Sequence, residues 1–152
     1  MVTGDVDAAL ANAVHVAKGT FETAYVEHAY IEPEAGAAWI DGNTLVIQVC
    51  TQAPYMNRDA VANVLGLNND AVRIIPASTG GGFGSKLDVT RQPLLGLAVL
   101  KTGKPCKMVF TRSESFQAST KRHPARMRAC AGIDAKGKIV GMVFDGDFNT
   151  GA

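Results

Sequence analysis

Glycine is concentrated in one short stretch of the chain, S-T-G-G-G-F-G-S-K-L-D, which spans Ser78–Asp88. Within Gly80–Gly84, four glycines surround a single aromatic residue, Phe83. Glycine loses more conformational freedom on folding than other residues, so this cluster indicates that something lies close to the backbone. A strand, a glycine-rich loop and a helix in this order can present backbone N–H groups to an anion.

Two familiar phosphate-binding patterns do not fit this loop. A P-loop requires G-x-x-x-x-G-K-[ST], and Leu87 stands at the hydroxyl position. A Rossmann fingerprint requires G-x-G-x-x-G, and Ser85 replaces the third glycine. A glycine-rich turn without a ligand and a binding loop both remain open. Phe83 favours the binding loop, because an exposed phenylalanine between glycines is costly unless it packs against something flat or large.

The flanking sequence predicts an α+β fold, with mixed or antiparallel sheets, hairpins and a few packed helices. Apolar and polar residues alternate in several segments, and Gly42–Asn43 forms a turn dipeptide between two such segments. Helices are predicted where apolar residues recur on one face. One of them follows Asn57 or Asp59, either of which could cap it, and it ends at Gly66. Strands and helices alternate irregularly, which excludes a doubly wound parallel sheet. The elements predicted in chain order are a helix at 6–13, an extended segment at 14–32, a hairpin at 37–52, the capped helix before 66, a strand at 71–79, a helix at 92–103, a strand at 104–112 and a hairpin at 125–149.

Composition narrows the classes of function. The 152 residues are 47% hydrophobic and 19% charged, with a formal net charge of +1, which gives no electrostatic case for binding nucleic acid. No apolar segment approaches the length of about 18 residues that a membrane span needs. Three scattered cysteines form neither a disulfide framework nor a zinc motif, and they fit a reducing compartment, so we expect a cytoplasmic protein.

Several segments together resemble one known family. The loop G-G-G-F-G-S-K resembles the G-G-G-F-G-[GNS]-K segment of the molybdenum hydroxylases, the family of xanthine dehydrogenase and aldehyde oxidase. Upstream, E-H-A-Y-I-E-P-E (Glu27–Glu34) and T-Q-A-P-Y-M-N-R (Thr51–Arg58) are similar to the family's segments in the same order. Downstream, G-K-P-C-K-M-V-F-T-R-S-E and K-R-H-P are similar as well. The resemblance covers residues 14–152, which predicts a lead-in helix at 1–13 and a partial molybdopterin-binding domain at 14–152, truncated at its C-terminus.

This resemblance implies an activity and a set of cofactors. Family members hold molybdenum on molybdopterin, usually the cytosine dinucleotide form in bacteria, and hydroxylate an aldehyde or an N-heterocycle with oxygen from water. Partner domains or subunits with [2Fe–2S] clusters, and often FAD, carry the electrons away. The remainder of the molybdenum subunit and a small-molecule substrate are therefore implied partners. No residue of this chain is implied to bind the metal directly, because the pterin holds it.

The resemblance also assigns residues. The glutamine in T-Q-A-P looks like the family glutamine whose amide reaches an oxygen ligand of molybdenum. The glycine loop looks like the family loop whose backbone N–H groups donate to an oxygen ligand of molybdenum. The positions assigned to the cofactor are Gln52, Gly81, Gly82, Phe83 and Gly84. Leu87 is implied to face the substrate, at the place where xanthine-acting members carry a glutamate. Leucine cannot form the corresponding hydrogen bond, which argues against a purine substrate.

Three other residues could carry chemistry. His28 could act as a base, but we favour a packed histidine that is hydrogen-bonded within a sheet. Glu32 and Glu34 flank Pro33 and could form a pair of acid–base carboxylates, but neither is assigned to catalysis. The family's catalytic glutamate lies near the C-terminal end of the large subunit, and no segment here resembles it. The chain alone is therefore expected to be inactive.

Two further interpretations stay open beside the enzyme fragment. One is a truncated, non-catalytic module of the same ancestry that acts as a binding or structural domain. The other is a plain phosphate- or nucleotide-binding domain, which ranks last because the loop fails both standard patterns. Gln52 and the intact loop favour the enzyme fragment, since a decayed copy would lose these positions first.

Overall fold

The computed structural model describes residues 1–150 and divides the chain into two compact units. One unit combines Met1–Val26 with the chain from His123 onward, and the other is Glu27–Arg122. The short strands β2 (Val26–Glu27) and β7 (Lys121–Arg122) pair with each other.

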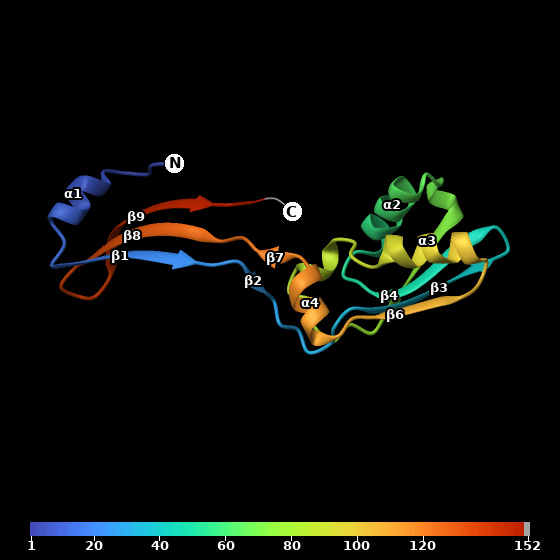
Figure 1. Ribbon diagram of the computed structural model, residues 1–152. Helices are drawn as coiled ribbons and strands as arrows, with labels where there is room; N and C mark the ends of the chain where they lie inside the picture. The colour runs from blue at the N-terminus through green and yellow to red at the C-terminus, as the bar shows by residue number, and fades with distance from the viewer. Residues whose placement is uncertain (151–152) are drawn as a thin grey trace. The chain divides into compact units, whose positions relative to one another are not determined.

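The first unit is a three-stranded antiparallel sheet with one helix (Figure 1). Its strands are β1 (His15–Thr23), β8 (Ala125–Ile133) and β9 (Ile139–Phe148), in the order β1-β8-β9. The β8–β9 hairpin confirms the predicted one. Helix α1 (Val6–Ala11) begins after Asp5, whose carboxylate accepts the N–H of Ala8. It packs where the sheet carries Gly132 and Gly141, since a Cβ at Gly132 would lie 3.0 Å from Leu10.

The opposite face of this sheet is apolar and exposed. Successive side chains of a strand point to opposite faces, so the residues that alternate with Gly141 lie away from α1. Phe21 and Phe144 lie over glycines of the same face, because a Cβ at Gly19 or at Gly146 would touch their rings. The large apolar side chains of this face that are more than half exposed are Phe21, Met142, Phe144 and Phe148.

The second unit has a mixed four-stranded sheet, which confirms the predicted α+β class. The order is β5-β4-β3-β6, with β4 (Thr44–Cys50) parallel to β5 (Val72–Ala77). Strand β3 (Ala35–Asp41) is antiparallel to β4 and to β6 (Cys106–Val109). Gly42 adopts a φ of 59° in the β3–β4 turn, which confirms the predicted hairpin.

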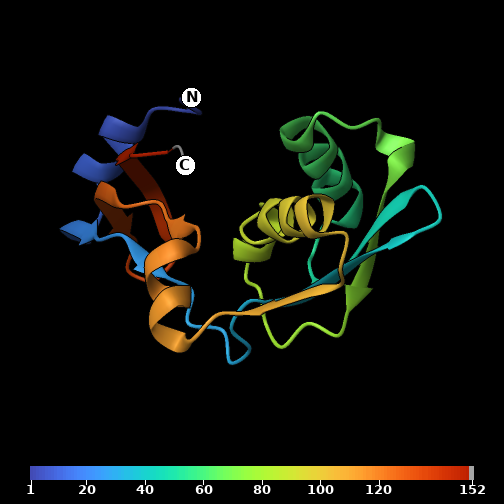
Figure 2. The same ribbon diagram turned by 45° about the vertical axis from the view of Figure 1, so that its right-hand side comes forward.

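Two helices cover one face of that sheet. Figure 2 shows α2 (Pro54–Leu65) and α3 (Gln92–Thr102) on the same side of it. The buried core lies between these helices and the strands and consists of Ala38, Leu45, Ile47, Val49, Val61, Ala62, Val72, Leu95 and Val99. The short elements of this unit are η1 (Asn69–Ala71), η2 (Ser85–Leu87) and α4 (Arg112–Ala118).

The structure corrects three local predictions. Helix α2 begins at Pro54, which suits the first turn because proline lacks an N–H, so the prediction of a cap at Asn57 or Asp59 is wrong. The extended segment predicted at 14–32 ends as a strand at Glu27. Helix α4 was not predicted, although T-R-S-E at its start forms a capping box, a pattern that marks a helix N-terminus.

Within the described residues, no helix is both long and apolar enough to cross a membrane.

Candidate functional site

The glycine-rich loop joins β5 to η2 and precedes α3, as the sequence predicted. Its backbone is left-handed at several positions, with φ values of 97° at Gly81, 51° at Phe83 and 96° at Gly84. A non-glycine residue seldom adopts such a φ, so the surrounding structure must hold Phe83 in place. Its side chain is 69% exposed. The loop therefore presents an aromatic ring to its surroundings from a constrained backbone.

The absence of side chains in this loop has a cause within the chain itself. A Cβ added at the first three glycines would overlap a side chain of the same unit, namely Glu32 at 2.6 Å for Gly80, Tyr30 at 2.9 Å for Gly81 and Gln52 at 2.4 Å for Gly82. Only Gly84 faces open space, and there the positive φ favours glycine. Most of the close approach that we expected from a ligand is thus made by neighbouring side chains.

Gln52 lies between β4 and α2, and its exposed side chain reaches the loop. Its Oε1 accepts the N–H of Gly84 at 3.1 Å, and its backbone N–H donates to Lys86 O at 3.0 Å. The Nε2 group of Gln52 and the N–H groups of Gly81–Phe83 donate no hydrogen bond within residues 1–150. The structure thus brings Gln52 and the loop together and leaves a group of donors free. The N–H of Gly84, which we expected to be free for the cofactor, is taken by Gln52.

A buried asparagine connects the end of the loop to α2. Asn57 donates from Nδ2 to Leu87 O at 2.7 Å, and its Oδ1 accepts from Thr51 at 2.6 Å and from Gln92 at 3.0 Å. These bonds fix the backbone of Leu87, whose side chain is 39% exposed. Asn57, which was predicted to be a possible helix cap, is therefore the hydrogen-bonding centre that holds Leu87, the position predicted to face the substrate.

A buried ion pair lies against the other side of the loop. The side chain of Lys86 is 2% exposed, and its Nζ lies 3.0 Å from Glu32 Oε2 and 4.4 Å from the centre of the Tyr30 ring. Burial alone would raise the pKa of Glu32, but the hydrogen bond from Gly80 N–H and the neighbouring Lys86 ammonium lower it overall. Glu32 therefore stays ionised at neutral pH. Sequence reasoning missed this pair, since 54 residues separate its members.

A second buried cation, Arg91, lies next to the core. Its Nη2 donates to Cys50 Sγ at 2.9 Å and to Cys50 O at 3.3 Å. Burial lowers the pKa of Arg91, and the neighbouring Cys50 and Glu34 act in the opposite direction. Glu34 is 1% exposed and accepts a hydrogen bond from Tyr30. These groups cannot reach a substrate, so they support the site rather than react in it.

The other candidates do not form a catalytic group. Glu32 is paired with Lys86 and Glu34 is buried, so they do not act as a pair of exposed carboxylates. His28 lies outside the strands, and its buried Nδ1 has no partner in the described residues, so the predicted hydrogen bond within a sheet is wrong. Among residues 1–150, no cluster of three or more His, Cys, Asp or Glu side chains could hold a metal ion.

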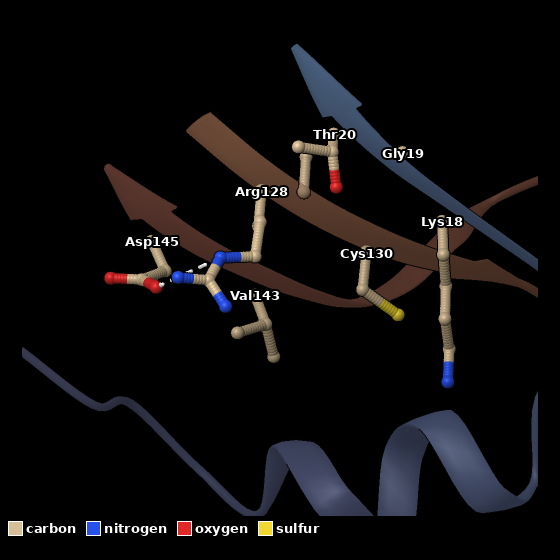
Figure 3. A pocket seen from close by; sticks show the side chains of 8 residues that line it. Lys18, Gly19, Thr20, Arg128, Cys130, Val143 and Asp145 are labelled. Atoms are coloured by element: carbon tan, nitrogen blue, oxygen red, sulfur yellow. Dashed lines mark ion pairs between the residues drawn. The ribbon is translucent and has the colours of Figure 1, made fainter. Parts of the chain in front are cut away.

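A separate hollow of about 470 Å³ lies in the first unit (Figure 3). Figure 3 shows Arg128 and Cys130 of β8, with Val143 and Asp145 of β9, on the side of the sheet that faces α1. Arg128 pairs with Asp145 at 3.6 Å, so that charge is already compensated. None of the predicted site residues lines this hollow, and we do not place the cofactor there.

A family model described as the molybdopterin cofactor-binding domain matches residues 1–152. The chain belongs to this family. Its match confirms the resemblance to molybdenum hydroxylases that the loop and its flanking segments indicated.

Relatives in the molybdopterin cofactor-binding family are much longer than this chain. The chain is 42% identical over 150 residues to the nicotinate dehydrogenase large molybdopterin subunit of Eubacterium barkeri, covering 98% of this chain and 35% of that subunit. It is 32% identical over 154 residues to the xanthine dehydrogenase molybdenum-binding subunit of Escherichia coli O157:H7, covering 20% of that subunit.

Solved structures of the family share the fold. The aldehyde oxidoreductase of Desulfovibrio gigas superimposes with a TM-score of 0.82 over 95% of this chain and 16% of its own, at 23% identity. The aldehyde oxidoreductase of Desulfovibrio desulfuricans gives a TM-score of 0.76 at 30% identity, over 88% of this chain and 15% of its own. The chain thus has the fold class of the molybdopterin-binding domains of this family.

Proposed function

We propose that this chain forms part of the cofactor-binding surface of a molybdenum hydroxylase that oxidises an aldehyde or an N-heterocycle with oxygen from water. One observation carries the proposal: Gln52, from the end of β4, meets the glycine loop, 32 residues further along the chain, at Gly82 and Gly84. These are the positions that the family resemblance assigns to the cofactor.

The residues present fit an oxygen-rich cofactor. Gln52 Nε2 and the N–H groups of Gly81–Phe83 are donors without an intramolecular partner in the described residues. Gln52 is exposed and its Oε1 already accepts from Gly84, so its Nε2 is left as a donor from which a ligand oxygen can accept. Backbone and amide donors fixed in advance stabilise developing negative charge without reorganising during the reaction.

When bound, the molybdenum centre would supply the two-electron oxidation of the substrate carbon. The chain's own residues would orient it: Gln52 and the loop backbone by hydrogen bonds, and Phe83 by ring contact from its exposed position. We propose the cytosine dinucleotide form of molybdopterin, with [2Fe–2S] clusters and FAD on partner domains or subunits. These finer assignments rest on the family resemblance.

Leu87 supports a substrate other than a purine. Its backbone is fixed by Asn57, and its partly exposed side chain offers only apolar contact. An apolar side chain cannot pair with the polar edge of a purine, and leaving such an edge unpaired costs affinity. We propose an aldehyde or a less polar N-heterocycle. The 42% identical relative is named for nicotinate, an N-heterocycle, which is compatible with this proposal.

The partner of this chain is proposed to be the remainder of a molybdenum subunit. The chain spans 35% of the Eubacterium barkeri subunit, so two thirds of that relative have no counterpart here. The apolar face of the first unit, which exposes Phe21, Phe144 and Phe148, supports a covering by further polypeptide. By itself the chain is proposed to be inactive. We also propose a cytoplasmic location, since all three cysteines are free thiols.

The test is to purify the protein from its native host and to measure its mass, its molybdenum and its pterin. We expect molybdenum and pterin in a product or complex several-fold heavier than 16.0 kDa, with hydroxylase activity on nicotinate or an aldehyde and little on xanthine. Gln52→Ala should lower the molybdenum content about tenfold, as the loss of one well-placed hydrogen bond would.

Gln117→Ala is the matched control, since Gln117 is an exposed glutamine on α4 whose side chain bonds only Ser113 within residues 1–150. A wild-type product without molybdenum would refute the enzyme proposal and favour the binding-module interpretation. Equal molybdenum in the Gln52 and Gln117 variants would refute the role of Gln52.

A further inference from the structure

We infer that Glu32 and Lys86 are positioning residues that hold the glycine loop in its binding shape before any cofactor arrives. The inference rests on the proposed function for what the loop binds, but the contacts that carry it belong to the chain alone. Neither residue is among those that the family resemblance assigned to the cofactor. Both act through the loop and touch no substrate.

Glu32 is bonded to the first residue of the loop in both directions. Its carboxylate Oε2 accepts the N–H of Gly80 at 2.7 Å, and its own N–H donates to Gly80 O at 3.2 Å. The Cβ of Glu32 also fills the space that a side chain at Gly80 would need. The backbone at the start of the loop is thus fixed to the segment before β3 by two hydrogen bonds and by direct packing.

Lys86 brings the same carboxylate to the other end of the loop. Its Nζ donates to Glu32 Oε2 at 3.0 Å and to Glu32 O at 2.9 Å, and it lies over the Tyr30 ring. Gly80 begins the loop and Lys86 comes two residues after its last glycine, Gly84, so the Glu32 carboxylate connects the start of the loop to the segment that follows it. The ammonium is almost fully buried, and a buried charge is retained only where it is paired and hydrogen-bonded.

This arrangement leaves the backbone N–H groups in the middle of the loop without an acceptor in the described part of the chain, so a ligand can accept from them. Gly80 N–H is bound by Glu32, Gly84 N–H by Gln52, and Ser85 N–H by Gly82 O at 2.9 Å. Within Gly80–Ser85, the N–H groups of Gly81–Phe83 are the ones that have no acceptor among residues 1–150. The base of the loop is therefore satisfied internally, and the left-handed Phe83 is held without any ligand.

If the Glu32–Lys86 pair holds the shape of the glycine loop, this explains why the pair is ionic. An apolar pair of similar volume often stabilises a fold as well as a buried ion pair does. Such a pair could not accept the N–H of Gly80 and would leave it unsatisfied. The carboxylate is needed because it receives two donors at once, and the ammonium is needed because it keeps that carboxylate charged and in place.

The test measures amide hydrogen exchange of the glycines by NMR in the cofactor-free chain. In Glu32→Gln, which keeps the shape but removes the charge, and in Lys86→Met, exchange of Gly80 N–H should rise about tenfold or more, the effect of losing a charge-assisted hydrogen bond. The rate of Gly80 N–H exchange in the double variant should equal that in the single variants, because each substitution removes the same coupled interaction. Glu32→Asp keeps the charge but shortens the side chain, and it replaces Lys86→Met as the second variant if Lys86→Met does not fold.

Glu22→Gln is the matched control. Glu22 also forms a close ion pair, with Arg126 at 2.7 Å, but both partners are exposed and lie in the other unit. Its loss should leave exchange of Gly80 N–H unchanged. Faster exchange of all amides to the same extent in the Glu32 variants would show a general loss of stability and would overturn the inference.

Molybdenum and pterin in the protein purified from its host give the second readout. A fall in both for Glu32→Gln, together with faster loop exchange, supports the inference. Faster loop exchange with an unchanged cofactor content overturns it, since the loop shape would then not matter for binding. Wild-type protein without cofactor refutes the proposed function instead, and the exchange data still decide whether the pair holds the loop.

Discussion

Replacing Gly82 with alanine separates the shape of the loop from the stability of the fold. The added Cβ would lie 2.4 Å from Gln52 Oε1 and 2.7 Å from its Cδ, so the glutamine side chain must move away. Gly82 lies outside the left-handed region, so its backbone accepts alanine without strain. The displaced Gln52 can no longer accept the N–H of Gly84.

The expected change in stability is small. Loss of this exposed hydrogen bond costs about 0.5–1.5 kcal/mol. Alanine reduces the entropy of the unfolded chain and returns about 0.4–1 kcal/mol. The free energy of unfolding should therefore fall by less than about 1 kcal/mol, which shifts Tm by no more than about 2–4 °C. Cofactor binding should suffer far more, because the Gln52 donor and the loop donors lose their arrangement. At about 1–1.5 kcal/mol for each hydrogen bond, one or two lost bonds weaken binding about 10- to 100-fold.

The assay pairs thermal unfolding with the molybdenum and pterin content of protein purified from the host. Gly96→Ala gives the opposite pattern: its Cβ would meet Leu65 at 2.6 Å and Leu45 at 3.0 Å in the core. Overpacking there costs about 1–3 kcal/mol and outweighs the helix propensity gained by alanine, about 1 kcal/mol, so Tm should fall. The cofactor content of the folded protein should stay unchanged. A Gly82 variant that keeps its full cofactor content would refute the role given to the Gln52–loop contact.

Two more predictions concern the groups around the loop. Asn57→Ala should lower the free energy of unfolding by about 2–4 kcal/mol, because Leu87 O and the buried side chains of Thr51 and Gln92 lose their hydrogen bonds. Urea denaturation would measure this change, and a loss below about 1 kcal/mol would contradict the buried network. Glu32 should titrate below the ordinary glutamate pKa, as followed by the chemical shift of Gly80 N–H. Because its folded-state pKa is lowered, its contribution to stability is present above the unfolded pKa and is lost as pH falls through the folded one. A midpoint at or above the ordinary value would contradict the ion pair.

Local patterns predicted much of the fold. The β3–β4 hairpin follows from alternating apolar residues around Gly42, and α3 follows from its apolar face between a first-turn proline and Gly103. These features depend on neighbours within a few residues, where backbone preference and turn chemistry act directly. The position of the glycine loop between a strand and a helix was predicted for the same reason.

Contacts between distant residues decided the rest. Asn57 has the residue type of a helix cap, but the helix begins earlier, at Pro54. The Asn57 amide therefore lies within the helix and hydrogen-bonds Thr51, Leu87 and Gln92. Strand β1 gains its neighbour β8 only after about a hundred residues of chain, as the pairing of Thr23 with Ala125 shows. Single-sequence periodicity carries no information on such pairings, because it records only which face of an element is apolar.

The sequence by itself determined the family of this protein, the α+β class and the glycine loop with its assigned glutamine. Only the tertiary structure revealed why the glycines are there. Glu32, Tyr30 and Gln52 occupy the volume that side chains would need, and Lys86 is buried against Glu32. Close packing and the pairing of a buried charge are properties of residues that meet in space, and no spacing along the chain encodes which residues will meet.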